Sequence, residues 1–202
     1  MQPKQPIMKK IGMKLFPLLK KEYILGLDFG DSSIKSALFR KSRDGLQLVK
    51  LKIAELAPQK QLLSVLREAV SGADLRNSEV IVALNSAQAM VKKIVVPQMP
   101  QNELKQALSL EAKNYFPFSV ADSLIDFQII GDTTEKGVKK TELLVGACPN
   151  RIIKECLDLL NRSGMRPVRL LHSSIALYAI IKAKGFTENT NAAALYIGKH
   201  FC

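Results

Sequence analysis

The regular alternation of apolar and polar residues begins at Tyr23 of this 202-residue chain. Residues 23–30 form a short apolar segment that ends in a glycine-containing turn, the pattern of a strand. Similar patterns predict two further strands, over residues 34–40 and 46–51. A helix over residues 60–71 and a buried strand over 79–84 are predicted next. The inner face of that helix is expected to hold its apolar side chains, Leu62, Leu63, Leu66 and Val70.

A second pattern lies between Leu84 and Cys148. It predicts a strand over residues 91–96 and a helix over 101–115, with Asn102 as the N-cap. Two more strands are expected, over residues 123–130 and 141–147, around a polar loop at 131–140. Strand, helix, strand and strand make a compact unit, so the sequence predicts an insertion within a larger α/β domain.

Helix and strand then alternate to the end of the sequence. A helix is predicted over residues 150–163, and Gly164 suits the left-handed position just after it. A strand over residues 167–171 and a helix over 174–183 follow, the helix capped by Ser173 or Ser174. A last strand is expected over residues 192–198. The predicted domains are residues 1–21, a basic tail; 22–85 with 148–202, an α/β unit; and 86–147, the insertion.

The net charge of +12 is concentrated at the N-terminus. Residues 1–21 hold six lysines and no acid, which leaves 12 − 6 = +6 for the remainder. The remaining basic residues are scattered and form no stripe interleaved with aromatics, so we expect no nucleic-acid partner. The lysines of the tail alternate with apolar residues, which fits either a solvated tail or a helix lying on an anionic membrane surface. The six are Lys4, Lys9, Lys10, Lys14, Lys20 and Lys21.

Three cysteines and two histidines narrow the chemistry further. Cys148, Cys156 and Cys202 are odd in number and lack CxxC spacing, which argues against a disulfide framework and a zinc site. Cys148 and Cys156 are expected to be small core residues. No apolar run is long enough to span a bilayer. We therefore expect a chain that works in a reducing, cytoplasmic compartment.

The turn after the first strand carries the most informative chemistry. Its small residues leave backbone N–H groups open to phosphate oxygens, while Asp28 could hold a metal and Lys35 could neutralise a phosphate. The P-loop pattern is absent. Taken alone, this segment also fits a plain β-turn. The candidate nucleotide-binding residues are Asp28, Gly30, Ser32, Ser33, Lys35 and, in the last predicted strand, Gly198.

These motifs resemble a known family. The hairpin around Asp28 and the order of elements resemble the first half of the actin/Hsp70/FtsA superfamily, which has a ribonuclease H-like α/β fold. Within the insertion, Val96-Pro97-Gln98-Met99-Pro100, Glu111-Ala112-Lys113-Asn114-Tyr115-Phe116-Pro117-Phe118 and Ile125-Asp126-Phe127 look like the type IV pilus assembly protein PilM family. FtsA and the cytoplasmic part of type II secretion platforms share this fold.

The resemblance implies a cytoplasmic adaptor at the inner membrane. Such proteins bind ATP and magnesium between two halves, and capture the cytoplasmic N-terminal peptide of the membrane protein PilN. The peptide groove lies between the first subdomain and the inserted one. Phe116 and Phe118 are candidates for that groove, with core packing as the alternative.

Several positions depart from the family pattern. Asp31 follows Gly30, where a small or hydroxyl residue is usual and a carboxylate repels phosphate. Tyr196 stands where an acid would orient a metal-bound water, and Leu171, His172 and Ser173 stand where acids are common. The sequence stops at Cys202, before a second half. We therefore expect ATP and magnesium binding to be weak or lost, hydrolysis to be absent, and the chain to be a truncated product or a short relative.

Three functions remain open from the sequence. The first is a binding module for a membrane partner, and the second is an ATPase half completed by another chain. The third is an FtsA-like or type II secretion scaffold. In each case an unpaired first half would expose apolar surface, so we expect self-association.

Overall fold

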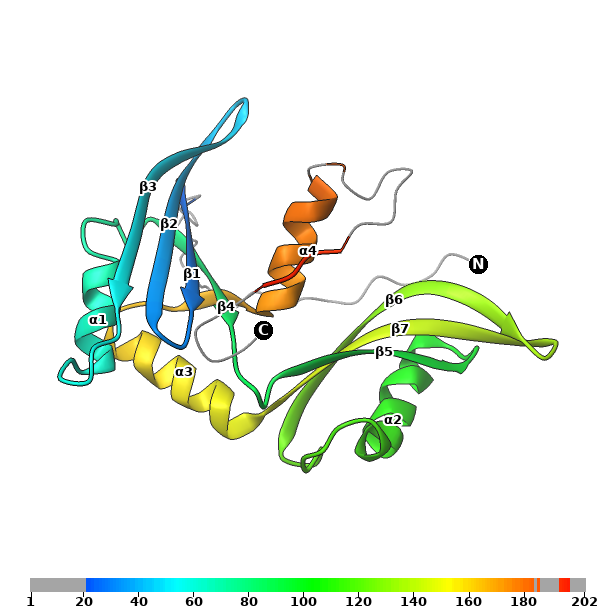
Figure 1. Ribbon diagram of the computed structural model, residues 1–202. Helices are drawn as coiled ribbons and strands as arrows, with labels where there is room; N and C mark the ends of the chain where they lie inside the picture. Colours follow the sequence, from blue (N-terminus) through cyan, green and yellow to red (C-terminus); the bar gives the residue numbers. More distant parts are fainter. Residues whose placement is uncertain (1–20, 184, 186–192, 197–202) are drawn as a thin grey trace, which may run out of the picture.

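The computed structural model describes residues 21–183, 185 and 193–196 (Figure 1). The basic tail, apart from Lys21, lies outside the described residues, and so does Gly198. Of the predicted last strand, residues 193–196 are described, and no strand is assigned to them. No helix within the described residues is long and apolar enough to cross a membrane.

A five-stranded sheet forms the first unit, with strand order β3-β2-β1-β4-β8. The antiparallel strands are β1 (Tyr23–Phe29), β2 (Ser33–Ser42) and β3 (Gly45–Glu55). β4 (Ser78–Leu84) and β8 (Pro167–His172) run parallel to β1. The sequence therefore predicted this sheet strand by strand, and the predicted α/β class is confirmed.

Helices α1 (Leu62–Ala69) and α3 (Asn150–Arg162) cover one face of this sheet (Figure 1). Alternate strand residues point to that face because side chains alternate along a strand, and they meet apolar residues of both helices. The predicted inner face of α1 was partly wrong, since Leu62 is 44% exposed. Val65 and Ala69 are buried instead. The core residues include Leu25, Leu27, Ile34, Val80, Val82, Val65, Leu66, Cys156 and Leu160.

The opposite face of the sheet is open except where α4 (Ser173–Ala183) borders β4 and β8 (Figure 1). Large apolar side chains of β3 remain exposed, among them Leu51 at 66% and Ile53 at 69%. A shallow apolar hollow of about 360 Å³ lies along this face, between β3 and α4.

The inserted unit is a three-stranded antiparallel sheet with strand order β5-β7-β6. Its strands are β5 (Met90–Pro97), β6 (Ser123–Glu135) and β7 (Val138–Pro149). Helix α2 (Gln101–Glu111) and the short 3-10 turn η1 (Ala112–Asn114) cover one face, around a core that includes Ile94, Leu104, Leu108, Phe116 and Val145 (Figure 1).

Two local predictions in the inserted unit were wrong. The polar loop expected at residues 131–140 is instead the far end of a long hairpin, which turns at Lys136 and Gly137 with φ of 52° and 78°. Positive φ at both central residues is typical of a tight two-residue hairpin. Asn102 is not the cap of α2, because the helix begins at Gln101 and the Pro100 carbonyl accepts from the Leu104 N–H at 3.1 Å.

The helix caps predicted for the first unit are confirmed for α3 but not for α4. Gly164 takes φ of +77° just after α3, as predicted. The predicted serine caps of α4 were wrong, since the helix begins at Ser173 itself. The residue before it, His172, accepts the Ser174 N–H at its Nδ1 over 3.2 Å.

Candidate functional site

A cleft opens where the parallel strands β1, β4 and β8 end. The carboxyl ends of parallel strands lie at one edge of a sheet, where α/β proteins usually bind ligands. Here that edge and the first turns of α4 enclose a cavity of about 500 Å³, within the range of small-molecule sites. Its lining includes Asp28, Asn85, His172, Ser173, Ser174, Leu177 and Tyr196.

Asp28 lines this cleft and faces Lys35, which lines the shallow hollow beside it. They are paired residues of β1 and β2, and Lys35 Nζ lies 3.2 Å from Asp28 Oδ2. The same ammonium lies 5.9 Å from the centre of the Tyr196 ring. Partial burial acts to lower the pKa of Lys35, but the hydrogen bond to Asp28, its negative charge and Tyr196 together raise it. The Lys35 ammonium therefore carries its positive charge, and the Asp28 carboxylate balances that charge.

The turn between β1 and β2 is closed by its own backbone. Gly30 N–H donates to the Ser33 carbonyl at 3.0 Å, and the Ser32 carbonyl accepts from Leu56 N–H at 2.8 Å. A Cβ at Gly30 would lie 2.9 Å from the Ser33 oxygen, so the turn requires glycine there. Ser33 is only 8% exposed, which leaves Ser32 as the more accessible of the two serines.

Of the predicted nucleotide-binding residues, Asp28 lines the cleft, whose volume suits a small molecule. Lys35 lies beside the cleft in the neighbouring hollow, and Gly30, Ser32 and Ser33 do not line it. Within the described residues, no group of three or more acidic, histidine or cysteine side chains could hold a metal ion. Asp28, the predicted metal ligand, is paired with Lys35, and that it contacts a metal stays a prediction.

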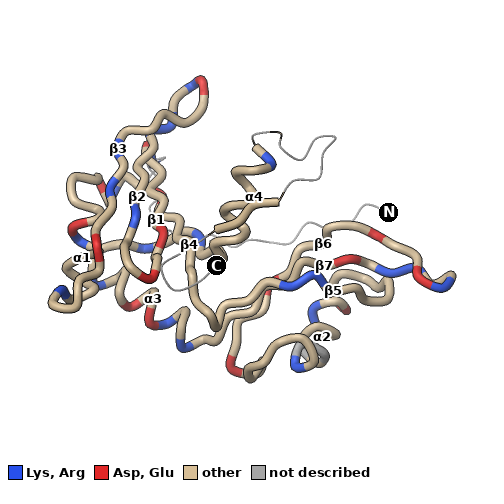
Figure 2. Tube along the Cα trace, viewed as in Figure 1, with Lys and Arg blue, Asp and Glu red and all other residues tan. Residues whose placement is uncertain are grey.

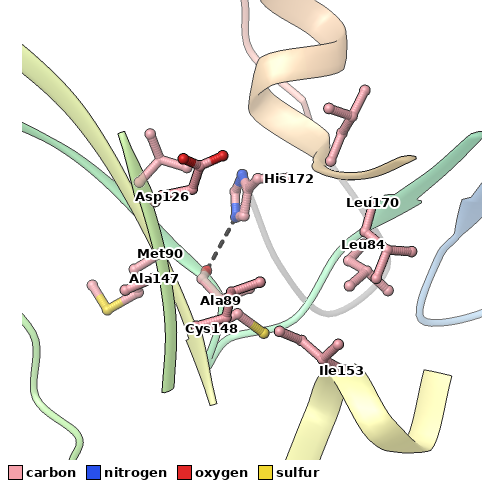
Figure 3. Close-up of a pocket in the computed structure, with 13 residues that line it drawn as sticks. Leu84, Ala89, Met90, Asp126, Ala147, Cys148, Ile153, Leu170 and His172 are labelled. Carbon is pink, nitrogen blue, oxygen red and sulfur yellow. Dashed lines mark hydrogen bonds between the residues drawn. The ribbon is translucent and has the colours of Figure 1, made fainter. Parts of the chain in front are cut away.

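A second, smaller cavity of about 130 Å³ lies where the two units meet (Figure 3). It is bounded by the ends of β4 and β8, by α3, and by the face of the inserted sheet that α2 leaves open. Its side chains are almost all apolar, with Asp126 and His172 as the charged or titratable exceptions beside Cys148. The lining includes Leu84, Met90, Leu124, Asp126, Cys148, Ile153, Leu170 and His172.

His172 contributes to both cavities. Its Nε2 lies 3.1 Å from the Ala89 carbonyl, just before β5, and its Nδ1 lies 2.7 Å from Ser174 Oγ. Next to it, Ser173 Oγ is buried and has no hydrogen-bond partner. The imidazole thus connects the end of β8 and the start of α4 to the first residues of the inserted unit.

The two described cysteines differ in surroundings. Cys156 is buried in the core of the first unit, while Cys148 is half-buried at the small cavity. Burial raises the pKa of the Cys148 thiol. Burial and the neighbouring Cys148 raise the pKa of Cys156 to about 11. Both are therefore poor nucleophiles at neutral pH.

Phe116 and Phe118, the predicted partner residues, lie in the inserted unit. Phe116 is 4% exposed and belongs to the core under α2, and Phe118 is half-buried and stacked on it at 5.7 Å. Neither lines the cavity between the units. That they contact a partner stays a prediction.

The sequence pattern had not marked Asn85, Asp126 and His172 as binding residues. Asn85 and His172 stand at the carboxyl ends of β4 and β8, so the rule for parallel strands would have found both. Asp126 gave no such signal, because only the packing of the two units brings it to the cavity.

The order of strands and the position of the inserted unit are those expected of the actin-like fold. The sequence matches the family profile of the type IV pilus assembly protein PilM over residues 26–190. The chain belongs to the PilM family.

Solved structures agree with this fold. A chain of the "PilM-PilN type IV pilus biogenesis complex" superposes with a TM-score of 0.67 at 23% identity, covering 82% of this chain and 51% of that one. The cytoplasmic domain of EpsL, an inner-membrane component of the type II secretion system of Vibrio cholerae, gives a TM-score of 0.56 at 17% identity, covering 76% and 58%. The chain thus spans about half the length of the solved PilM chain. No curated protein matches the sequence.

Proposed function

We propose that this chain is an adaptor of type IV pilus assembly that binds the cytoplasmic N-terminal peptide of a PilN-like inner-membrane protein. The observation that carries the proposal is the apolar cavity between the two units. Membership of the PilM family supports the choice of partner, and so does the similar solved complex, which is named for PilN beside PilM.

The cavity suggests what the peptide offers. A cavity of about 150 Å³ can hold a benzene-sized group, so one of about 130 Å³ suits a single apolar side chain. Leu124, 58% exposed on β6, continues the apolar surface beyond the cavity. Asp126 gives the rim one negative charge. We therefore propose a peptide with an apolar anchor residue close to a basic one.

The larger cleft is proposed as a weak nucleotide site. Asp28 lines this cleft, and Lys35 would have to reach the phosphates from the neighbouring hollow, so binding must compete with the existing Asp28–Lys35 ion pair. Phosphoryl transfer needs metal-holding acids and groups on both sides of the phosphate. Asp28 alone does not supply them, so we propose binding without hydrolysis. Magnesium, if carried, would come with the nucleotide and contact Asp28.

Location follows from the partner. We propose a cytoplasmic protein held at the inner membrane through its PilN-like partner. Direct membrane contact through residues 1–21 would add to this hold, and no nucleic acid is involved. Figure 2 supports the last point, because acidic and basic residues alternate over both units without forming one basic stripe.

A peptide-binding measurement tests the function. Leu124→Asp places a charge at the proposed groove, and we expect it to weaken binding of a fluorescent PilN-type N-terminal peptide by about tenfold or more, the loss of one apolar anchor. Leu110→Asp is the matched control, since Leu110 is 74% exposed on α2, away from the cavity. Equal affinity of both variants and the parent would reject the groove, and no binding by the parent would reject the function.

The second candidate function, a nucleotide-binding half completed by another chain, is favoured by the 500 Å³ cleft. Calorimetry with ATP separates the two: micromolar affinity for the chain alone supports this candidate over a pure scaffold.

A further inference from the structure

His172 occupies the one position in the described residues that lines both the nucleotide-sized cleft and the groove between the units. From this placement and its hydrogen bonds, we propose that His172 is a positioning residue that couples the two cavities, and that protonation of its ring breaks the coupling. The identity of the two ligands rests on the proposed function. The hydrogen bonds of the ring to Ala89 and Ser174 do not depend on that proposed function.

The hydrogen bonds define the state of the ring. A backbone N–H can only donate and a carbonyl can only accept. Nδ1, which receives the Ser174 N–H at 3.2 Å, must therefore carry no proton. Nε2, 3.1 Å from the Ala89 carbonyl, must carry the proton and donate it. The geometry thus requires a neutral imidazole in a single tautomer.

Each nitrogen serves one cavity. Through Nδ1 the ring caps α4, satisfying an N–H that the helix leaves unpaired. The first turn of α4 forms a wall of the cleft, where Ser173 Oγ still lacks a partner. Through Nε2 the ring holds Ala89, which lies in the wall of the groove just before β5. A ligand in the cleft that shifts the start of α4 would therefore move the His172 ring, and the ring would in turn move Ala89 and the inserted unit.

Protonation of the His172 ring would change the same two hydrogen bonds. The doubly protonated ring donates from both nitrogens, so Nδ1 would meet the Ser174 N–H with a proton of its own. The titratable groups facing the ring are Asp126 and Cys148 in the groove, and Asp28 and Tyr196 across the cleft. The Asp126 carboxylate is drawn beside the ring in Figure 3. A doubly protonated ring would lose the cap on α4, because Nδ1 could no longer accept the Ser174 N–H.

Two substitutions separate the functions of the ring. In His172→Asn the side-chain oxygen replaces Nδ1 and keeps the cap, but the amide is too short to reach Ala89. In His172→Gln the amide nitrogen replaces Nε2 and keeps the tie to Ala89 without the cap. Val168→Asn is the control, because Val168 lies on the same strand, is 53% exposed and lines neither cavity.

The first measurement needs no ligand. Nitrogen-15 spectra of the full chain, with His200→Gln to assign the ring signals, should show the Nε2–H tautomer at neutral pH. On acidification, the amide signals of Ser174 and Met90 should move with the same midpoint as the ring. In both His172 variants this shared midpoint should vanish, while Val168→Asn keeps it. An averaged or Nδ1–H tautomer, or amides that titrate independently of the ring, would overturn the proposal.

The second measurement uses the ligands of the proposed function. Saturating ATP should tighten PilN-type peptide binding about fivefold, the lower range of measured couplings. The ratio should fall to about one in both His172 variants and stay fivefold in Val168→Asn. An unchanged ratio in the variants rejects His172 as the link. If the parent binds no peptide, the proposed function fails, and the nitrogen-15 titration alone decides the role of His172.

Discussion

At the scale of single residues, Gly30 has the least freedom to change. Replacing it with alanine would bring a Cβ to 2.9 Å from the Ser33 oxygen, where backbone must move. We expect Gly30→Ala to cost about 1–3 kcal/mol of unfolding free energy, measured by urea denaturation, and to disturb the turn between β1 and β2. Gly26→Ala in the same strand is the control, since its nearest neighbour would be 3.8 Å away. Equal losses in both variants would contradict the crowding argument.

Cys156 gives a pH dependence at the same scale. Its pKa is raised from the ordinary 9.0 to about 11 in the folded chain. The folded state thus binds the proton more tightly, so the contribution to stability is complete below pH 9.0 and is lost as pH rises towards 11. We expect the difference in unfolding free energy between the parent and Cys156→Ala to shrink from pH 8 to about 11. A constant difference would show that the thiol does not titrate differently on folding.

The sequence predicted best those elements that bury one face. Strands with one buried face, such as β1 and β4, were predicted correctly because their apolar residues alternate. Residues 131–135 and 138–140 were expected to be a loop, because polar side chains occupy both faces and only the backbone ladder holds them together. His172 was not recognised as a binding residue, because its role depends on Ala89, far away in sequence.

At the scale of elements, the buried face of α1 is rotated slightly from the face that the sequence predicted, and this changes which leucines are buried. Leu66 is fully buried while Leu62, one turn earlier, is 44% exposed. We expect Leu66→Ala to cost about 2–5 kcal/mol and Leu62→Ala less than about 1 kcal/mol, measured by denaturant unfolding. The substitution is the same and the helix is the same, so the difference reports burial. Similar costs would mean that α1 packs as the sequence suggested.

At the scale of the whole molecule, the open face of the five-stranded sheet dominates. Exposed apolar side chains on β3 include Leu46, Leu48, Val49, Leu51 and Ile53. Contiguous apolar surface of this kind usually meets another surface. The solved PilM chain is about twice as long as the part matched here, so more protein is available to cover it there.

Self-association should follow from that face when the chain is studied alone. We expect sedimentation velocity to show concentration-dependent oligomers of the parent, and Ile53→Lys to shift the distribution towards monomer by placing a charge on the patch. Leu110→Lys is the control, since Leu110 is equally exposed but lies on α2. A parent that stays monomeric at high concentration would rule out the expectation.

The junction between the units consists of two chain crossings, residues 84–90 and the passage from β7 into α3 at Pro149–Asn150. Met90 and Ala147 pair directly on neighbouring strands, so the two crossings run close together. A joint of this form bends readily across its width but resists torsion, since twisting would wind one crossing around the other. We therefore expect the inserted sheet to bend about this joint more readily than it twists, and such bending would widen or narrow the proposed peptide groove.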